Sequence, residues 1–191
     1  MSSSKLLHLS RVSKEENICR AISLETTSYP ADEAASASMI RFRQNHASAF
    51  FWAAYLQNTD QDSQTFVGFI NGTLTAKEKL DEESMAQHDP HGSLLCIHSV
   101  VIDQVFRRQG LGAQMLKQYV NIICNSQPQV KRIMLISKAY LVRFYTSCGF
   151  TVKKLSSVVH GVDPWFELEL DCEAAKLAGM VTQSRKYGEA S

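Results

Sequence analysis

Residues 94–112, with the sequence LLCIHSVVIDQVFRRQGLG, decide the fold that this chain predicts. The part from Ser93 to Asp103 is almost continuously apolar, which is typical of a strand buried on both faces. The hexapeptide Arg107-Arg108-Gln109-Gly110-Leu111-Gly112 follows, and an apolar stripe at helical spacing begins within it. The stretch therefore predicts a strand, a tight turn and a helix in direct succession.

The turn between this strand and this helix has the properties of an anion site. N–H groups in the first turn of a helix lack intrahelical acceptors, and the helix dipole favours an anion there. Gly110 and Gly112 have no side chain that would keep a phosphate away from these amides. A P-loop would need Gly-Lys-Ser/Thr, and a dinucleotide fingerprint would need a small residue where Met115 stands. We expect a pyrophosphate cradle; the alternative is a helix start whose glycines only relieve a tight turn.

The rest of the chain supplies further strands and helices in mixed order. We expect strands at 5–12, 49–56, 65–75, 132–137, 151–155 and 165–170, and helices at 13–29, from 36, at 111–122 and at 141–147. Ser13 and Glu16 have the spacing of a capping box. Residues 57–64 are predicted to form a polar hairpin loop, and residues 77–92 a mobile loop that could contain a helical turn. This order predicts a mixed α+β fold in one domain over 1–172, with a tail over 173–191 that is either a docked helix or disordered.

Composition limits the classes of function. Twenty basic and 19 acidic residues leave a net charge of +1, which argues against nucleic acid as a partner. The chain has no apolar run of about 20 residues and no secretory signal, so we expect no membrane partner. Five scattered cysteines without a CxxC motif favour reduced thiols and a cytoplasmic location. His88 and His91 have no further spaced ligands, so no metal is expected. We expect a monomer.

Four blocks of the sequence resemble one enzyme family. The pattern Arg107-x-x-Gly110-x-Gly112 after a strand resembles the acetyl-CoA signature of the GNAT acetyltransferase superfamily. Residues 96–102 (CIHSVVI), 106–110 (FRRQG) and 142–150 (VRFYTSCGF) resemble the serotonin (arylalkylamine) N-acetyltransferases, and 29–36 (YPADEAAS) is similar to the substrate loop of their non-vertebrate members. The fungal polyamine acetyltransferase is similar as well. The resemblance covers most of residues 15–171. It implies the GNAT fold, with a central, mostly antiparallel, splayed sheet flanked by helices.

The resemblance also implies a co-substrate and the residues that hold it. Acetyl-CoA would bind with its pyrophosphate on the backbone amides of 108–113 and its pantetheine arm along the end of the preceding strand. The cofactor-binding residues would be Val100, Val101, Ile102, Arg107, Arg108, Gln109, Gly110, Leu111, Gly112 and Ala113. Tyr29, Pro30, Asp32 and Glu33 would bind the substrate, a small primary amine. The two acidic residues could attract a cationic amine; the alternative is that they are ordinary charges before a helix.

Two residues match the family's catalytic positions. A protonated amine has a pKa of about 10.4, so only about one molecule in a thousand is nucleophilic at pH 7. His98 would remove the amine proton through water, and Tyr145 would protonate or hydrogen-bond the departing thiolate. The second histidine of the family is replaced by Cys96. The alternatives are a core histidine and a packed aromatic ring.

These residues predict direct attack of the amine in a ternary complex, with a relay through Cys96 as the weaker route. An arylalkylamine and a polyamine remain open as substrates. A protein lysine or N-terminal acetyltransferase and a non-catalytic CoA-binding module are the competing classes. The aromatic residues at 50–52 and 165–166 are candidates either for a substrate pocket or for the core.

Overall fold

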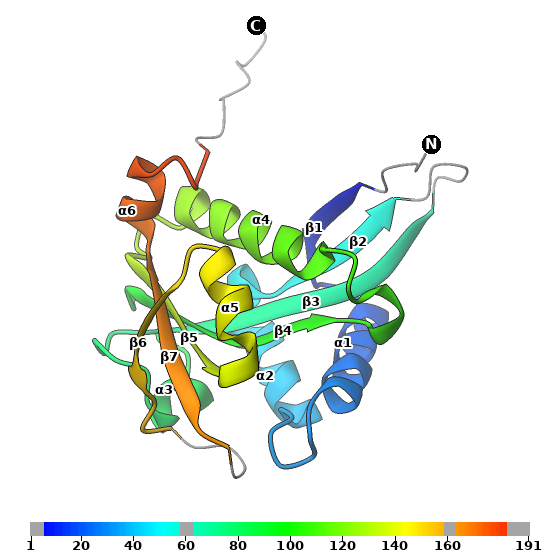
Figure 1. The fold of residues 1–191 in the computed structure, drawn as a ribbon. Coiled ribbons are helices and arrows are strands. Elements are labelled where there is room, and N and C mark those ends of the chain that lie inside the picture. Colours follow the sequence, from blue (N-terminus) through cyan, green and yellow to red (C-terminus); the bar gives the residue numbers. More distant parts are fainter. Residues whose placement is uncertain (1–5, 58–62, 159–162, 183–191) are drawn as a thin grey trace, which may run out of the picture.

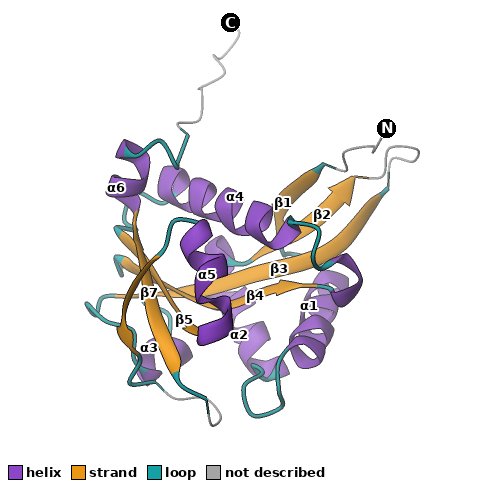
Figure 2. Ribbon diagram, viewed as in Figure 1, coloured by secondary structure: helices purple, strands orange, loops and turns teal. Residues whose placement is uncertain are grey.

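The computed structural model describes residues 6–57, 63–158 and 163–182, which form a seven-stranded sheet with helices on both faces (Figures 1 and 2). The strands are β1 (Leu7–Arg11), β2 (Trp52–Gln57), β3 (Gln64–Thr75), β4 (Leu94–Ile102), β5 (Arg132–Lys138), β6 (Thr151–Leu155) and β7 (Trp165–Asp171). The helices are α1 (Glu15–Ser28), α2 (Ala37–His46), α3 (Glu82–Ala86), α4 (Leu111–Ser126), α5 (Ala139–Ser147) and α6 (Cys172–Leu177). The predicted mixed α/β fold is confirmed.

The sheet is antiparallel except at its centre, where β4 and β5 run parallel. Its strand order is β1-β2-β3-β4-β5-β7-β6. The parallel pair extends only from Leu94↔Arg132 to Cys96↔Met134, although both strands continue for several residues. On its other side β4 stays paired with β3 as far as Ile102. The two parallel strands therefore diverge halfway, which is the predicted splay of the sheet.

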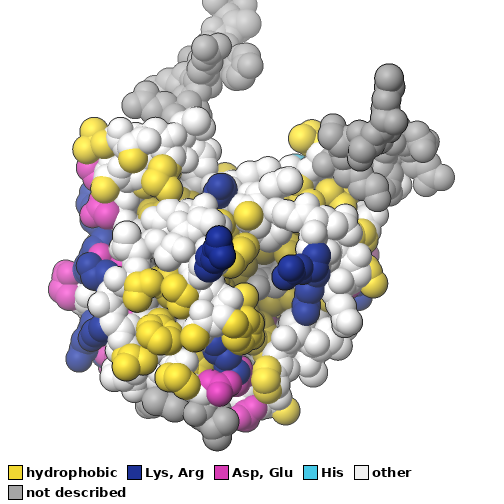
Figure 3. Space-filling view, viewed as in Figure 1, with side chains coloured by type: hydrophobic (Ala, Val, Ile, Leu, Met, Phe, Trp, Pro, Cys, Tyr) yellow, Lys and Arg dark blue, Asp and Glu magenta, His cyan; other side chains and the backbone are white. Residues whose placement is uncertain are grey.

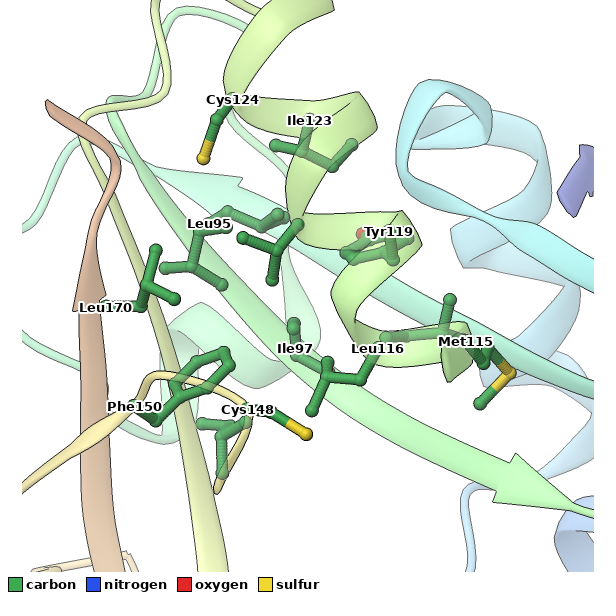
Figure 4. Close-up of a cluster of buried hydrophobic side chains, with 14 of the residues drawn as sticks. Leu95, Ile97, Met115, Leu116, Tyr119, Ile123, Cys124, Cys148, Phe150 and Leu170 are labelled. Atoms are coloured by element: carbon green, nitrogen blue, oxygen red, sulfur yellow. The ribbon is translucent and has the colours of Figure 1, made fainter. Parts of the chain in front are cut away.

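The largest core cluster lies between α4 and the sheet. Figure 4 shows Leu116 and Tyr119 of α4 pointing toward Leu95 and Ile97 of β4, with Phe150 closing the cluster from the chain after α5. The Tyr119 hydroxyl is buried and donates to the Phe50 carbonyl at 3.0 Å, so its polar end is satisfied. This packing holds the N-terminus of α4 at a defined position relative to the end of β4.

The opposite face of the sheet is covered by α1 and α2. Ile18 and Leu24 of α1 and Ile40 of α2 pack in a second buried cluster with Phe51 and Phe69. The two faces thus carry different parts of the site: α1 and the 29–36 loop on one, α4 and α5 on the other (Figure 1).

Local details differ from the sequence prediction at the start of α1 and at the start of β2. The capping box at Ser13 is wrong, because α1 begins one residue later with Lys14 as an N-cap whose side chain makes no capping bond. The predicted strand start at 49 is a short 3₁₀ turn over Ser48–Phe50. The predicted loop 77–92 contains α3, closed by a capping box between Asp81 and Ser84. The start of α2 is as expected, since the Ser36 side chain accepts from the Met39 N–H at 3.2 Å.

The predicted tail begins with the short helix α6, which packs against α4. After it, the Thr182 N–H donates to the side chain of Asn121 on α4 at 2.8 Å, and Val181 is buried. Residues 183–191, the remainder of the predicted tail, and most of the predicted 57–64 hairpin loop lie outside the described residues.

Candidate active site

A cavity of about 550 Å³ lies where β4 and β5 diverge. Its lining comes from the end of α1, the 29–36 loop, α2, β4, β5, α5 and the start of β7. Figure 3 shows this face of the molecule, with Lys and Arg side chains on both sides of hydrophobic side chains at its centre. The predicted residues Tyr29, Pro30, Asp32, Glu33, His98, Val100, Val101, Ile102, Arg107 and Tyr145 all line the cavity. Sequence segments more than 100 residues apart therefore meet here.

His98 reaches this cavity at an irregularity of the sheet. Asn71 pairs with Ser99, and Gly72 pairs with Ile97, so His98 is the extra residue of a β-bulge. A bulge bends the strand and redirects the side chain at the extra position. The strands approach so closely here that a Cβ on Gly72 would lie 2.6 Å from the Cys96 carbonyl oxygen. The His98 ring is held at Nε2, which lies 2.7 Å from Thr73 Oγ1.

Tyr145 of α5 enters the same cavity from the other face of the sheet. The side chain is 7% exposed, and its ring makes edge contacts with Phe144 and Phe150 at centroid distances of 4.9 and 6.1 Å. Burial raises the pKa of Tyr145 above that of an exposed phenol. The hydroxyl is therefore neutral at physiological pH and has a proton to donate.

The glycine turn fits a phosphate group. Arg108 and Gly110 both have positive φ, 63° and 79°, so the chain turns sharply before α4. Gly110 is the N-cap of α4 and provides no side-chain cap, which leaves the first-turn N–H groups available. A Cβ built on Gly110 would have no atom within 4 Å, so the space in front of the turn is open. Open space, available amides and a helix N-terminus satisfy the requirements of an anion cradle.

Two residues that are predicted to contact the cofactor, Arg107 and Val100, also contact other parts of the protein. The Arg107 guanidinium donates to the Ile102 carbonyl at 2.8 Å and to the Ser28 hydroxyl at 2.9 Å. This side chain thus ties the end of α1 to the end of β4 and shapes the turn. The Tyr29 side chain lies beside the backbone of Val100, within the strand segment predicted to meet the pantetheine arm, and burial raises the pKa of the Tyr29 hydroxyl.

Glu33, predicted to attract the amine, is paired with Lys138. The ammonium lies 2.6 Å from the Glu33 carboxylate and 3.1 Å from that of Asp163, and it sits 5.5 Å from the Trp165 ring centroid. The paired side chains are only 11% and 6% exposed for Lys138 and Glu33. This contact joins the 29–36 loop to the end of β5 across the cavity. Asp32 is exposed at the rim.

Two buried charged residues in the cavity wall were not predicted to belong to the site. Glu25 of α1 and Arg43 of α2 are 2% and 5% exposed. The Glu25 carboxylate accepts from the Ala35 N–H at 3.0 Å, and burial raises its pKa. Arg43 donates to the Asn71 side chain at 3.3 Å, and burial lowers its pKa to about 10. Their helical positions, Glu25 beside the buried Leu24 and Arg43 three residues after Ile40, were the only sequence signal of burial.

Cys96 does not belong to the cavity lining. It is fully buried, and burial raises the pKa of its thiol to about 12. A thiol of this kind is poorly nucleophilic, so the geometry argues against a relay through Cys96. Among the described residues, no cluster of three or more His, Cys, Asp or Glu is placed to hold a metal.

The aromatic candidates divide between the cavity and the core. Phe50 and Phe51 are buried in the two core clusters, and the Trp52 indole donates to the Ala49 carbonyl at 2.9 Å. Trp165 lines the cavity, whereas Phe166 packs at the edge of the main core.

The splayed sheet and the helix N-terminus beside it define a protein of the GNAT class. A family model described as "Acetyltransferase (GNAT) domain" matches residues 43–165, well over half of the sequence. The chain belongs to this family.

Individual relatives agree with this assignment. The chain is 36% identical over 110 residues to the serotonin N-acetyltransferase of Mesocricetus auratus, covering 56% of this chain and 53% of the relative. It is 37% identical over 84 residues to that of Homo sapiens, covering 44% and 40%. The chain thus spans about half the length of the curated relatives it matches, or less.

Solved structures share the fold at low identity. The loading GNATL domain of CurA from Lyngbya majuscula superposes with a TM-score of 0.74 at 16% identity, covering 88% of this chain and 99% of that domain. NAA60 of Arabidopsis thaliana, solved in complex with acetyl-CoA, superposes with a TM-score of 0.66 at 13% identity, covering 87% and 99%. In the part of the chain that the structure describes, no helix is long and apolar enough to cross a bilayer.

Proposed function

We propose that this chain transfers the acetyl group of acetyl-CoA to the primary amine of a small molecule, by direct attack in a ternary complex. The observation that carries the proposal is that His98 of β4 and Tyr145 of α5 line one cavity, which Arg107 at the start of the open turn before α4 also lines. Acetyl-CoA supplies an acetyl group activated as a thioester. The five scattered cysteines, which form no CxxC motif, are the basis for proposing a reducing, cytoplasmic location.

In this proposal His98 acts on the proton of the amine, and Tyr145 acts on the departing thiolate. His98 accepts a proton from the ammonium through water, which leaves the amine nitrogen with a lone pair. That nitrogen forms a bond to the acetyl carbon while the carbon–sulfur bond breaks. Tyr145 donates a hydrogen bond to the sulfur as negative charge develops on it. The amides at the start of α4 hold the pyrophosphate and so position the thioester.

The lining of the cavity supports an arylalkylamine as the substrate. Its acidic residues are Glu25, Asp32 and Glu33, and its basic residues are Arg43, Arg107 and Lys138. A polyamine needs an excess of negative charge along its length, whereas here the charges balance. The remaining wall is largely apolar and aromatic and includes Tyr29, Met39, Leu135, Tyr140, Leu141 and Trp165. Such a wall suits one amine on an apolar ring system.

The contact between Glu33 and Lys138 supports a small substrate over a protein. It bridges the cavity from the 29–36 loop to β5, so a polypeptide would have to displace a buried ion pair in order to enter. The ribosomal-protein-S18-alanine N-acetyltransferase of Escherichia coli shares the fold at 13% identity, and fold likeness at this identity does not select a substrate.

The test is a thiol-release assay with acetyl-CoA and a panel of amines: tryptamine, serotonin, phenethylamine, spermine, lysine and lysine-containing peptides. We expect the arylalkylamines to have the highest kcat/KM. Fastest turnover of spermine would assign a polyamine acetyltransferase, and fastest turnover of peptides a protein acetyltransferase. Tight acetyl-CoA binding without turnover of any amine would identify a CoA-binding module.

A further inference from the structure

Two hydrogen bonds of Thr73 link His98 to helix α3. Thr73 lies on β3 and is fully buried, with Oγ1 3.0 Å from the Ser84 carbonyl oxygen and 2.7 Å from His98 Nε2. A hydroxyl group has a single proton to donate, and a carbonyl oxygen can only accept. The Thr73 proton is therefore directed at Ser84. His98 Nε2 must then be the donor in its own bond to Thr73, so it carries the N–H.

A neutral imidazole with its proton on one nitrogen has its basic lone pair on the other. We propose that Thr73 fixes His98 as the Nε2–H tautomer, so that His98 accepts the amine proton at Nδ1. Thr73 is a positioning residue, because it acts through the ring and is not part of the cavity lining. The catalytic use of Nδ1 rests on the proposed function, whereas the tautomer does not.

The Ser84 carbonyl oxygen is held in place and can only accept a hydrogen bond. The donor and acceptor roles in the two hydrogen bonds of Thr73 can therefore be assigned in only one way. The Asp81 carboxylate accepts from the Ser84 N–H, and the Ser84 hydroxyl accepts from the Asp81 N–H, both at 2.9 Å. Lys77 pairs with the same carboxylate at 2.9 Å. If Thr73 turned its proton toward His98, the Ser84 carbonyl would lose this side-chain donor in a buried setting, which is costly.

The same arrangement supports the proton transfer itself. When Nδ1 takes up a proton, the Nε2–H still points at Thr73 Oγ1, and the bond becomes charge-assisted and stronger. The charged ring is thus stabilised without moving. The predicted loop 77–92 thereby has a role in the site, because it contains the helix whose carbonyl orients the hydroxyl.

The direct test is the tautomer of His98 in the free protein. We would label the protein with ¹⁵N-histidine, record two-bond ¹H–¹⁵N correlations about two units above the ordinary imidazole pKa of about 6.5, and assign His98 from the spectrum of His98→Gln. The expected result is protonation at Nε2. Protonation at Nδ1 would overturn the proposal whether or not the protein acetylates an amine, and this measurement needs no folded variant at Thr73.

Variants at Thr73 test the consequence for turnover. Thr73→Val keeps the shape and removes the hydroxyl, so we expect a mixture of tautomers and a kcat lower by about tenfold, with the KM for acetyl-CoA unchanged. Thr73→Ser should restore both the tautomer and most of kcat. The matched control is Thr75→Val on the same strand, since Thr75 is buried but accepts only from the Lys77 N–H at 3.1 Å in the described contacts. A Thr73→Val protein with the wild-type tautomer and kcat would refute the proposed role.

Discussion

Tyr145→Phe separates a catalytic hydroxyl from a packed ring. The substitution keeps the contacts with Phe144 and Phe150, so the fold should be conserved. A free thiol has a pKa of about 8.5 and an ordinary phenol about 10, so full proton transfer to the thiolate costs about 2 kcal/mol. Burial raises the pKa of Tyr145 further and makes full transfer less favourable still. We therefore expect Tyr145 to donate a hydrogen bond and to keep its proton.

The size of the effect follows from the value of that bond. A hydrogen bond to a charged group contributes about 1.5–3 kcal/mol. At about 1.36 kcal/mol per tenfold change, kcat should fall by about 10- to 150-fold. Affinity for acetyl-CoA should be unchanged, because the thioester sulfur carries little charge before it leaves.

The assay is single-turnover acetyl transfer, in which the chemical step is observed directly. Because the raised pKa keeps the Tyr145 hydroxyl protonated up to and beyond pH 10, the ratio of wild-type to variant rates should be constant between about pH 6 and pH 9. An acyl donor with a more acidic thiol should partly restore the rate. The control is Tyr55→Phe, which makes the same change on β2 outside the cavity lining. Wild-type single-turnover rates in Tyr145→Phe, or a rate ratio that changes steeply with pH, would refute this reasoning.

Three further perturbations test other parts of the site. His98→Ala should lower kcat/KM most at pH values below the pKa of the amine and least where free amine is abundant; an equal loss at every pH would show that the residue is structural. Gly110→Ala and Gly179→Ala introduce the same strain, since both positions have positive φ and open space around a new Cβ, and each should cost about 1–2 kcal/mol of stability. Only the Gly110 substitution should weaken acetyl-CoA binding, as measured by calorimetry. Equal affinities in the two variants would show that the turn before α4 does not bind the cofactor. Lys138→Met should leave Glu33 buried without its partner, lowering Tm and raising the KM for the amine more than that for acetyl-CoA; unchanged Tm and KM values would show that the contact does not close the cavity.

The sequence by itself determined the elements and the turn. The apolar run of 94–102 and the helical stripe after Gly112 depend only on local periodicity, and both appear where they were expected. Gly110 takes a positive φ, a conformation in which a glycine is unstrained. Errors at this level were local, such as the capping box at Ser13, because a cap depends on the φ and ψ of one residue and its pattern occurs often by chance.

The tertiary structure alone decided which groups meet in the cavity and in the wall behind it. Glu33 and Lys138 are 105 residues apart, and Thr73 and His98 are 25 apart on different strands. Their contacts depend on the register between β3 and β4, on the bulge at His98 and on the point where β4 and β5 stop pairing. A shift of one residue in a strand reverses the face of every side chain, so short-range patterns contain no information on these pairs. The sequence therefore predicted an anion-binding turn on a mixed sheet, and packing across the sheet decided which charges are neutralised and which hydroxyl faces the His98 ring.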